Sequence, residues 1–230
     1  MKHSAVLKTL VERTEQRFNE NTSDYSKKHL YDMKKMLSSV QSLERVAVSR
    51  NPKETQELHM SKVAKSATRL GDEVERLNKR AMQIYAEGFV NIDEKIHSQI
   101  NLRPTAYAAE IRAALKGMTS KDRGDALNAA LRAKDTELLG AIFDAPEIIT
   151  GINRELKNSY IENIKESLAP ELMDQRRQLV ESFDESSLVI QSSMKAVSDG
   201  FDPVKIQQIE EQERKSIEAN DRFEASLREA

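Results

Sequence analysis

The chain has 230 residues, of which 32% are charged and only 5% aromatic, and it contains neither Trp nor Cys. The absence of Cys excludes disulfides, thiol chemistry and cysteine-ligated metal sites. Seven Gly and five Pro are too few for the turns of a sheet protein, whereas abundant Ala, Leu, Glu, Lys, Arg and Gln are typical of long helices. We predict an all-α protein in which long, coiled-coil-like helices flank a compact cluster of short helices.

The formal net charge of −2 is unevenly distributed. Residues 1–103 contain 19 Lys and Arg against 14 Asp and Glu, a balance of +5, and residues 104–230 contain 17 against 24, a balance of −7. In both halves the opposite charge is interspersed, so the sequence argues against a nucleic-acid surface. The asymmetry is suited to steering contacts between subunits.

Neither a signal peptide nor a membrane span is expected. The opening "MKHSAVLKTLVERTEQ" has its apolar stretch broken by Lys8. The longest apolar run, 138–143 with one Gly inside it, is far below the ~20 residues that cross a bilayer.

Two amphipathic helices are predicted first, at about 2–19 and 23–49. Thr22 or Ser23 is a suitable N-cap for the second helix, because both side chains can accept a bond from a free backbone N–H. The tripeptide "RNP" at 50–52 then interrupts the helical pattern.

The clearest periodic pattern lies in a third predicted helix, 53–101, which would be roughly 70 Å long. Its apolar residues are separated alternately by three and four positions, as in the a/d stripe of a coiled coil. We call this row the seam: Met60, Val63, Ala67, Leu70, Val74, Leu77, Ala81 and Ile84. A lone helix with such a stripe exposed is unstable, so we expect the seam to pair within the chain or between copies.

Residues 104–151 have a shorter period, and we predict helices at 105–117, 121–133, 136–144 and 146–151. Thr119 or Ser120 and Asp135 are suitable N-caps, and Gly117 and Gly151 are suitable helix ends. We expect the core of this compact module to consist of large apolar residues: Ile111, Leu115, Leu127, Leu131, Leu138, Leu139, Ile142 and Phe143.

A second stripe with spacings of three and four follows in the C-terminal part. Its apolar members that we expect to contact a partner are Val180, Phe183, Ile190, Met194, Val197 and Phe201, with Met173 at its start. Arg176 and Ser187 are polar positions of the stripe, which cost stability but can fix register. Asp202 and Pro203 then suggest the start of a last, mostly polar helix. We divide the chain into an N-terminal arm 1–103, a compact module 104–151 and a C-terminal arm 152–230.

Sequence motifs for chemistry are weak. Glu94-x-x-His97 has the spacing of a ferritin-like metal ligand pair, but the chain has no second copy to face it, so surface residues are the favoured interpretation. There is no G-x-S-x-G turn and no glycine-rich phosphate loop. The basic pairs at 27–28 and 34–35 are either a weak phosphate-binding patch or the polar side of a helix. We expect no catalytic, cofactor-binding or metal-binding residues.

One segment resembles a known group of proteins. Residues 109–152, "AEIRAALKGMTSKDRGDALNAALRAKDTELLGAIFDAPEIITGI", are similar to a segment of uncharacterised helical proteins encoded in bacteriophage and prophage genomes. The shared features are the Ile-Arg-Ala opening, an Arg in the turn and the closing "GAIFDAP". The resemblance covers about a fifth of the chain. It implies a viral origin, in a virion or in the host cytoplasm, and assigns no site residues.

Three functions are therefore considered. The leading hypothesis is a non-enzymatic structural or assembly protein, a bacteriophage virion component or capsid-assembly factor, that forms homo-oligomers through its seams and contacts other assembly proteins. The alternative is an intracellular helical binding module that clasps a host or viral protein, with its seams satisfied inside one chain. The third is a helical enzyme with a carboxylate metal centre.

Overall fold

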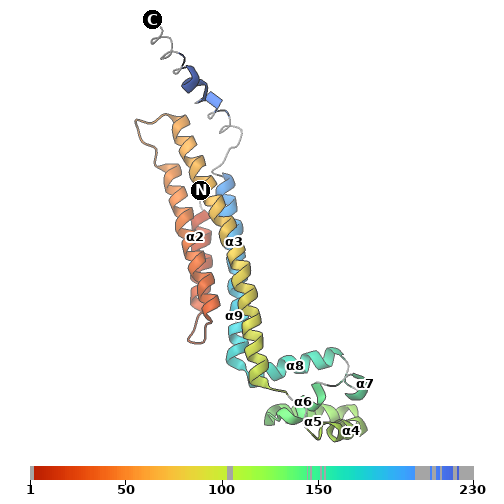
Figure 1. Cartoon of the computed structure of the whole chain (residues 1–230). Helices are drawn as coiled ribbons and strands as arrows, with labels where there is room; N and C mark the ends of the chain where they lie inside the picture. The colour runs from red at the N-terminus through yellow and green to blue at the C-terminus, as the bar shows by residue number, and fades with distance from the viewer. Residues whose placement is uncertain are drawn as a thin grey trace. The chain divides into compact units, whose positions relative to one another are not determined.

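The structure, a computed structural model, describes residues 3–102, 106–143, 145, 147–150, 152, 154–199, 208, 211–212, 214–219 and 222. These residues form α-helices and no strand, which confirms the all-α prediction. In chain order the helices are α1 (His3–Arg17), α2 (Asp24–Val48), α3 (Gln56–Ile100), α4 (Ala108–Gly117), α5 (Ser120–Ala133), α6 (Thr136–Phe143), α7 (Glu147–Thr150), α8 (Arg154–Leu168) and α9 (Pro170–Asp199) (Figure 1).

The helices α5 and α6 begin at residues whose side chains cap the helix N-terminus. The side-chain oxygen of Thr119 accepts a hydrogen bond from the backbone N–H of Asp122 at 3.2 Å, at the start of α5. At the start of α6, Asp135 Oδ1 accepts one from Leu138 N–H at 3.0 Å. Each bond satisfies a backbone donor that the helix cannot. The caps predicted at Thr119 and Asp135 are confirmed.

The chain folds into two compact units, each assembled from separate stretches of sequence. Unit 1 consists of Met1–Phe18, Asp24–Tyr85 and Glu181–Ala230, and unit 2 consists of Asn19–Ser23 and Ala86–Val180. Helices α3 and α9 therefore each supply residues to both units. The predicted division into 1–103, 104–151 and 152–230 concerns consecutive segments and stays a prediction. The two units are a different kind of division, because each combines segments that are far apart in the chain.

The core of unit 1 contains much of the predicted seam, residues 60–84, which lies on α3 and is named the α3 seam. Leu70, Val74 and Leu77 are 5%, 1% and 3% exposed. They belong to one buried cluster with residues of α1, α2 and α9: Leu7, Leu10, Val11, Leu30, Met33, Met36, Val40, Leu43, Val189 and Ala196. The α3 seam thus finds its partners in the same chain.

The two ends of the α3 seam differ in burial. Ile84 is 6% exposed and Ala81 2%, so burial follows the predicted row to its last member. At the other end Met60 and Val63 are half-buried, and the neighbouring Ser61 and Ala64 are the buried residues instead. Burial is therefore displaced by one residue there, so a different face of α3 is buried at this end than along the rest of the seam.

The buried row of α9 is also displaced from the predicted stripe, here by one position towards the N-terminus. Val180, Phe183, Ile190 and Val197 are half-buried, Met194 is 49% exposed, and Phe201 lies outside the described residues. In unit 1 the most buried row of α9 lies one position earlier in each turn: Ser182, Ser186, Val189, Ser193 and Ala196. Most of this row is Ser or Ala, and small residues at a contact let helix axes approach closely.

Unit 2 contains the short helices and buries most of the predicted module core. Leu115, Leu127, Leu139, Ile142 and Phe143 are between 0% and 9% exposed. The remaining three, Ile111, Leu131 and Leu138, are half-buried. Helix α6 packs against α4 and α5, and Arg112 Nη1 of α4 donates to the carbonyl of Ala141 at 3.1 Å.

The burial of the α3 seam predicts a large cost for truncating it. Leu77→Ala should lower the free energy of unfolding by about 2–5 kcal/mol, because it removes buried apolar contact and leaves a cavity. Met82 lies on the same helix with 56% of its surface exposed, so Met82→Ala is the matched control and should change stability by less than about 0.5 kcal/mol. Urea denaturation followed by circular dichroism measures both; equal effects would contradict the packing described.

Candidate functional site

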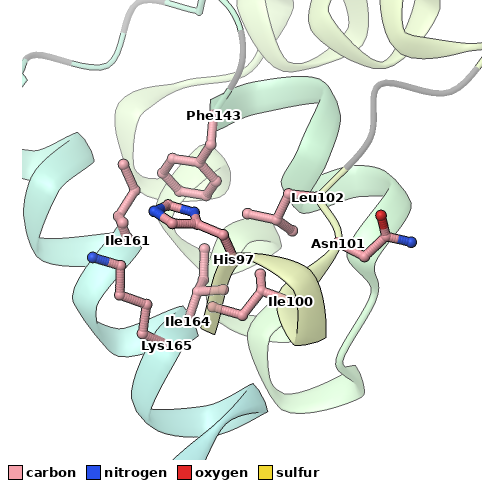
Figure 2. Close-up of a pocket in the computed structure, with 8 residues that line it drawn as sticks. All are labelled: His97, Ile100, Asn101, Leu102, Phe143, Ile161, Ile164 and Lys165. Atoms are coloured by element: carbon pink, nitrogen blue, oxygen red, sulfur yellow. The ribbon is translucent and has the colours of Figure 1, made fainter. Parts of the chain in front are cut away.

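Unit 2 contains a pocket of ≈ 370 Å³ between the end of α3, the end of α6 and one face of α8. Five of its lining residues are apolar and three are polar (Figure 2): Ile100, Leu102, Phe143, Ile161 and Ile164, and His97, Asn101 and Lys165. We call it the α3–α8 pocket. Its volume lies at the low end of the ~300–1,000 Å³ of ligand pockets, so it suits one side chain or a small molecule.

The α3 wall of the pocket is shaped by the way the helix stops. Asn101 has φ 43°, in the left-handed region that Asn tolerates better than most residues. Its N–H donates to the carbonyl of His97 at 3.0 Å, the single backbone bond of a left-handed helix cap. This turn directs the chain away from the helix axis and places Leu102 beside Ile100 in the lining (Figure 2).

Side-chain to backbone bonds hold the other walls. Gln99 Nε2 donates to the carbonyl of Leu168 at 2.9 Å, which ties the end of α3 to the end of α8. Lys157 Nζ of α8 donates to the carbonyl of Ala145 at 3.0 Å, just beyond α6. The ring of Phe143 lies 6.5 Å from that of Tyr160, centroid to centroid, in a tilted contact.

The lining is graded in exposure. Ile164 is 0% exposed, Ile100 5% and Phe143 9%, while Ile161, Leu102 and Lys165 are half-buried and His97 and Asn101 are exposed. In Figure 2 the amide of Asn101 points away from the other labelled side chains, so its part in the wall is mainly that of the turn. The pocket has an apolar floor, has Lys165, His97 and Asn101 as its polar residues, and has no carboxylate in its lining.

Sequence reasoning found one part of this pocket and missed another. Phe143 was predicted as a module core residue and is buried as well as lining the pocket. Ile161, Ile164 and Lys165 were not singled out, although their spacing of three and four marks one face of a helix. The sequence does not show that these residues lie near His97, because the three walls of the pocket come from separate segments that only the folded structure brings together.

Glu94 and His97 are both exposed on α3. Over the part of the chain that the structure describes, no three His, Asp or Glu side chains group as metal ligands would. His97 instead takes its place at the edge of the pocket.

The four lysines of the predicted basic pairs in α2 lie close to groups of their own chain. Lys34 lies 2.6 Å from Glu15, Lys35 2.7 Å from Glu73 and Lys27 3.7 Å from Asp24, each measured from Nζ to a carboxylate oxygen. The Nζ of Lys28 lies 5.1 Å from the ring centroid of Tyr25. Arg76 and Lys35 hold the pKa of Glu73 down at about 2, chiefly through the hydrogen bonds that they donate to its carboxylate. These lysines therefore contact side chains of α2 itself and of the neighbouring helices α1 and α3.

Arg176, predicted as a register-fixing polar residue, is a junction within unit 2. Its Nε lies 3.0 Å from Asp93 Oδ1 of α3, and its Nη1 lies 3.8 Å from Glu162 Oε2 of α8. The guanidinium also lies 4.7 Å from the ring centroid of Phe89. One side chain of α9 thus contacts both helices that form the α3–α8 pocket.

Unit 1 buries several charged groups at its helix contacts. Glu185 of α9, with 4% of its side chain exposed, has its Oε1 2.6 Å from Arg13 Nε and 3.1 Å from Arg17 Nη1 of α1. Asp32 of α2 lies 3.0 Å from Arg80 Nε of α3. Burial raises the pKa of Asp32 above its ordinary value, and Arg80 opposes that shift. These pairs connect α1 to α9 and α2 to α3.

His29 of α2 is fully buried beside an aromatic stack. Its ring centroid lies 5.9 Å from that of Phe183 in an edge contact, and Phe183 stacks on Tyr85 with centroids 4.4 Å apart. Neither ring nitrogen of His29 has a hydrogen-bond partner among the described residues. Burial lowers the pKa of His29 to about 4, because an imidazolium there would lose its hydration without compensation.

Comparison of the chain with protein-family models, with curated proteins and with solved structures gave no match. Within the described ranges, each helix is too short or too polar to traverse a lipid bilayer.

The buried His29 predicts acid sensitivity. Its pKa is lowered from 6.5 to about 4, so its contribution to stability is intact above pH 6.5 and is lost as the pH falls from 6.5 towards 4. The loss approaches about 3 kcal/mol at 1.36 kcal/mol per pKa unit. His29→Leu should remove this component of the pH dependence, whereas His97→Gln, at an exposed position, should retain it. Urea titrations between pH 4 and 7 compare the variants, and an unaltered pH profile for His29→Leu would refute the assignment.

Proposed function

We propose that the protein is a non-enzymatic structural or assembly protein that holds a partner protein, and that the α3–α8 pocket is its docking site. The observation that supports this most is the pocket itself, whose five apolar lining residues and ≈ 370 Å³ fit one inserted side chain. Binding energy in protein interfaces concentrates in such anchors, which are apolar or aromatic side chains seated in pockets.

The burial of the α3 seam bears on which assembly mode we propose. Leu70, Val74 and Leu77 already pack against α1, α2 and α9 of their own chain. Pairing of copies through this row would require unit 1 to open and expose its core, at the cost of most of its stability. We therefore place the partner contact at the α3–α8 pocket of unit 2 and assign the seam to folding, as in the alternative hypothesis of a binding module.

The biological setting rests on the resemblance of residues 109–152. Phe143 of that segment lines the pocket, so the segment with the phage-like pattern contributes a wall of the proposed docking site. Among assembly roles, we propose a bacteriophage virion component or capsid-assembly factor. A clasp for a host or viral protein outside the virion is the second candidate, and the identity of the bound partner separates the two.

The test is a matched pair of variants in a purified complex. Ile161→Glu places a charge at a half-buried wall of the pocket, and Val90→Glu places the same charge at an apolar residue of unit 2 that is 57% exposed and outside the lining. A partner captured by the wild-type chain and then purified should bind at least tenfold more weakly to Ile161→Glu and unchanged to Val90→Glu, by titration calorimetry.

Circular dichroism confirms that both variants are folded, and light scattering should give the wild-type chain a monomer mass. Equal partner affinity in both variants would refute the pocket as the docking site. Self-association that survives in a folded Ile161→Glu variant would favour homo-oligomerisation through another surface.

A further inference from the structure

We infer that the α3–α8 pocket recognises the C-terminal residue of its partner, an apolar side chain together with its free carboxylate. This inference rests on the proposed docking role and specifies the chemistry of the docked segment. The apolar side chain of the ligand is inferred from Ile100, Ile164 and Phe143, which are at most 9% exposed and form the floor of the pocket. A polar group placed on this floor would lose its hydration without gaining a hydrogen bond, whereas an apolar group would not.

The charge of the ligand follows from the polar edge. The lining includes the ammonium of Lys165, together with His97 and Asn101, and no Asp or Glu, so the charged group of the lining is a cation. The Lys165 side chain is only 15% exposed, which makes its ammonium less screened than that of a surface lysine. An anion at this edge gains an attraction that a neutral group lacks.

Lys165 already contacts a carboxylate, and this contact leaves room for a second. Its Nζ lies 2.7 Å from Glu162 Oε1. An ammonium has three N–H donors, so one bond to Glu162 leaves two for a ligand. Glu162 is itself 50% exposed and also contacts Arg176 at 3.8 Å, so its charge is shared.

The position of Lys165 argues for a C-terminal carboxylate. Ile161 lies one turn before Lys165 on α8, so the apolar wall and the ammonium are neighbours on one helix face. A bound anion must then lie within about one residue of the apolar group that fills the pocket. The C-terminal residue of a chain meets this condition, because its carboxylate and its side chain leave the same carbon atom.

The experiment uses the full chain and small probes of that residue. N-acetyl-phenylalanine and its primary amide differ only in the carboxylate, and N-acetylglycine lacks the apolar side chain. For a ligand of this size, the acid should bind with a Kd near the millimolar range. Binding is followed by NMR shifts of isotope-labelled isoleucine methyl groups, which include Ile100, Ile161 and Ile164.

We expect the acid to bind about tenfold more tightly than the amide, and N-acetylglycine to produce no shifts. Lys165→Met keeps the aliphatic stem and removes the charge, so it should abolish the preference for the acid. Lys95→Met removes a charge from an exposed residue of α3 outside the lining and should leave the preference intact.

Each other result contradicts a different statement. Equal binding of acid and amide would overturn the carboxylate inference and leave apolar docking standing. Equal binding of N-acetyl-aspartyl-phenylalaninamide and the acid would reassign the anion to an acidic side chain. No shift of pocket methyl groups with any probe would refute the pocket as a binding site, and with it the proposed docking role.

Discussion

The burial of the α3 seam is the constraint on which unit 1 depends. A helix with Leu70, Val74 and Leu77 facing water would expose a continuous apolar stripe, and each buried side chain of this size is worth roughly 1.5–3 kcal/mol. The stripe is buried in one cluster with residues of α1, α2 and α9. Because those helices come from both ends of the chain, covering one stripe fixes the placement of segments separated by more than a hundred residues.

The charged pairs of unit 1 act at the margins of that core. Arg13 and Arg80 keep 50% and 47% of their side chains exposed, while their partners Glu185 and Asp32 are 4% exposed. One member of each pair thus stays hydrated, which limits the desolvation cost that burying both would impose. His29 lacks such a partner, so unit 1 buries an imidazole ring without a hydrogen bond to either nitrogen, beside the ring of Phe183.

Most of the helices could be predicted from the sequence, because helix starts and stops are set by local chemistry. Thr119 and Asp135 mark helix starts through bonds to backbone groups three residues away. The partners of the α3 seam could not be predicted, since spacing alone does not distinguish a helix of the same chain from one of a copy. The buried row of α9 was missed by one position because Ser and Ala at its contact have little hydrophobic signal. The α3–α8 pocket was beyond reach because it combines an αL turn at Asn101 with side chains of two other helices.

The order of the two units along the chain has a consequence for biosynthesis. The residues of unit 2 between Ala86 and Val180 are translated after α2 and before the part of α9 that completes unit 1. A growing polypeptide therefore holds α1, α2 and the seam of α3 without their last covering helix while about a hundred further residues are added. At ~5–20 residues per second this interval lasts roughly 5–20 seconds. During this interval α9 does not yet cover Leu70, Val74 and Leu77, so chaperones and neighbouring nascent chains can contact them. The exposure ends when α9 has been synthesised and packs against the α3 seam.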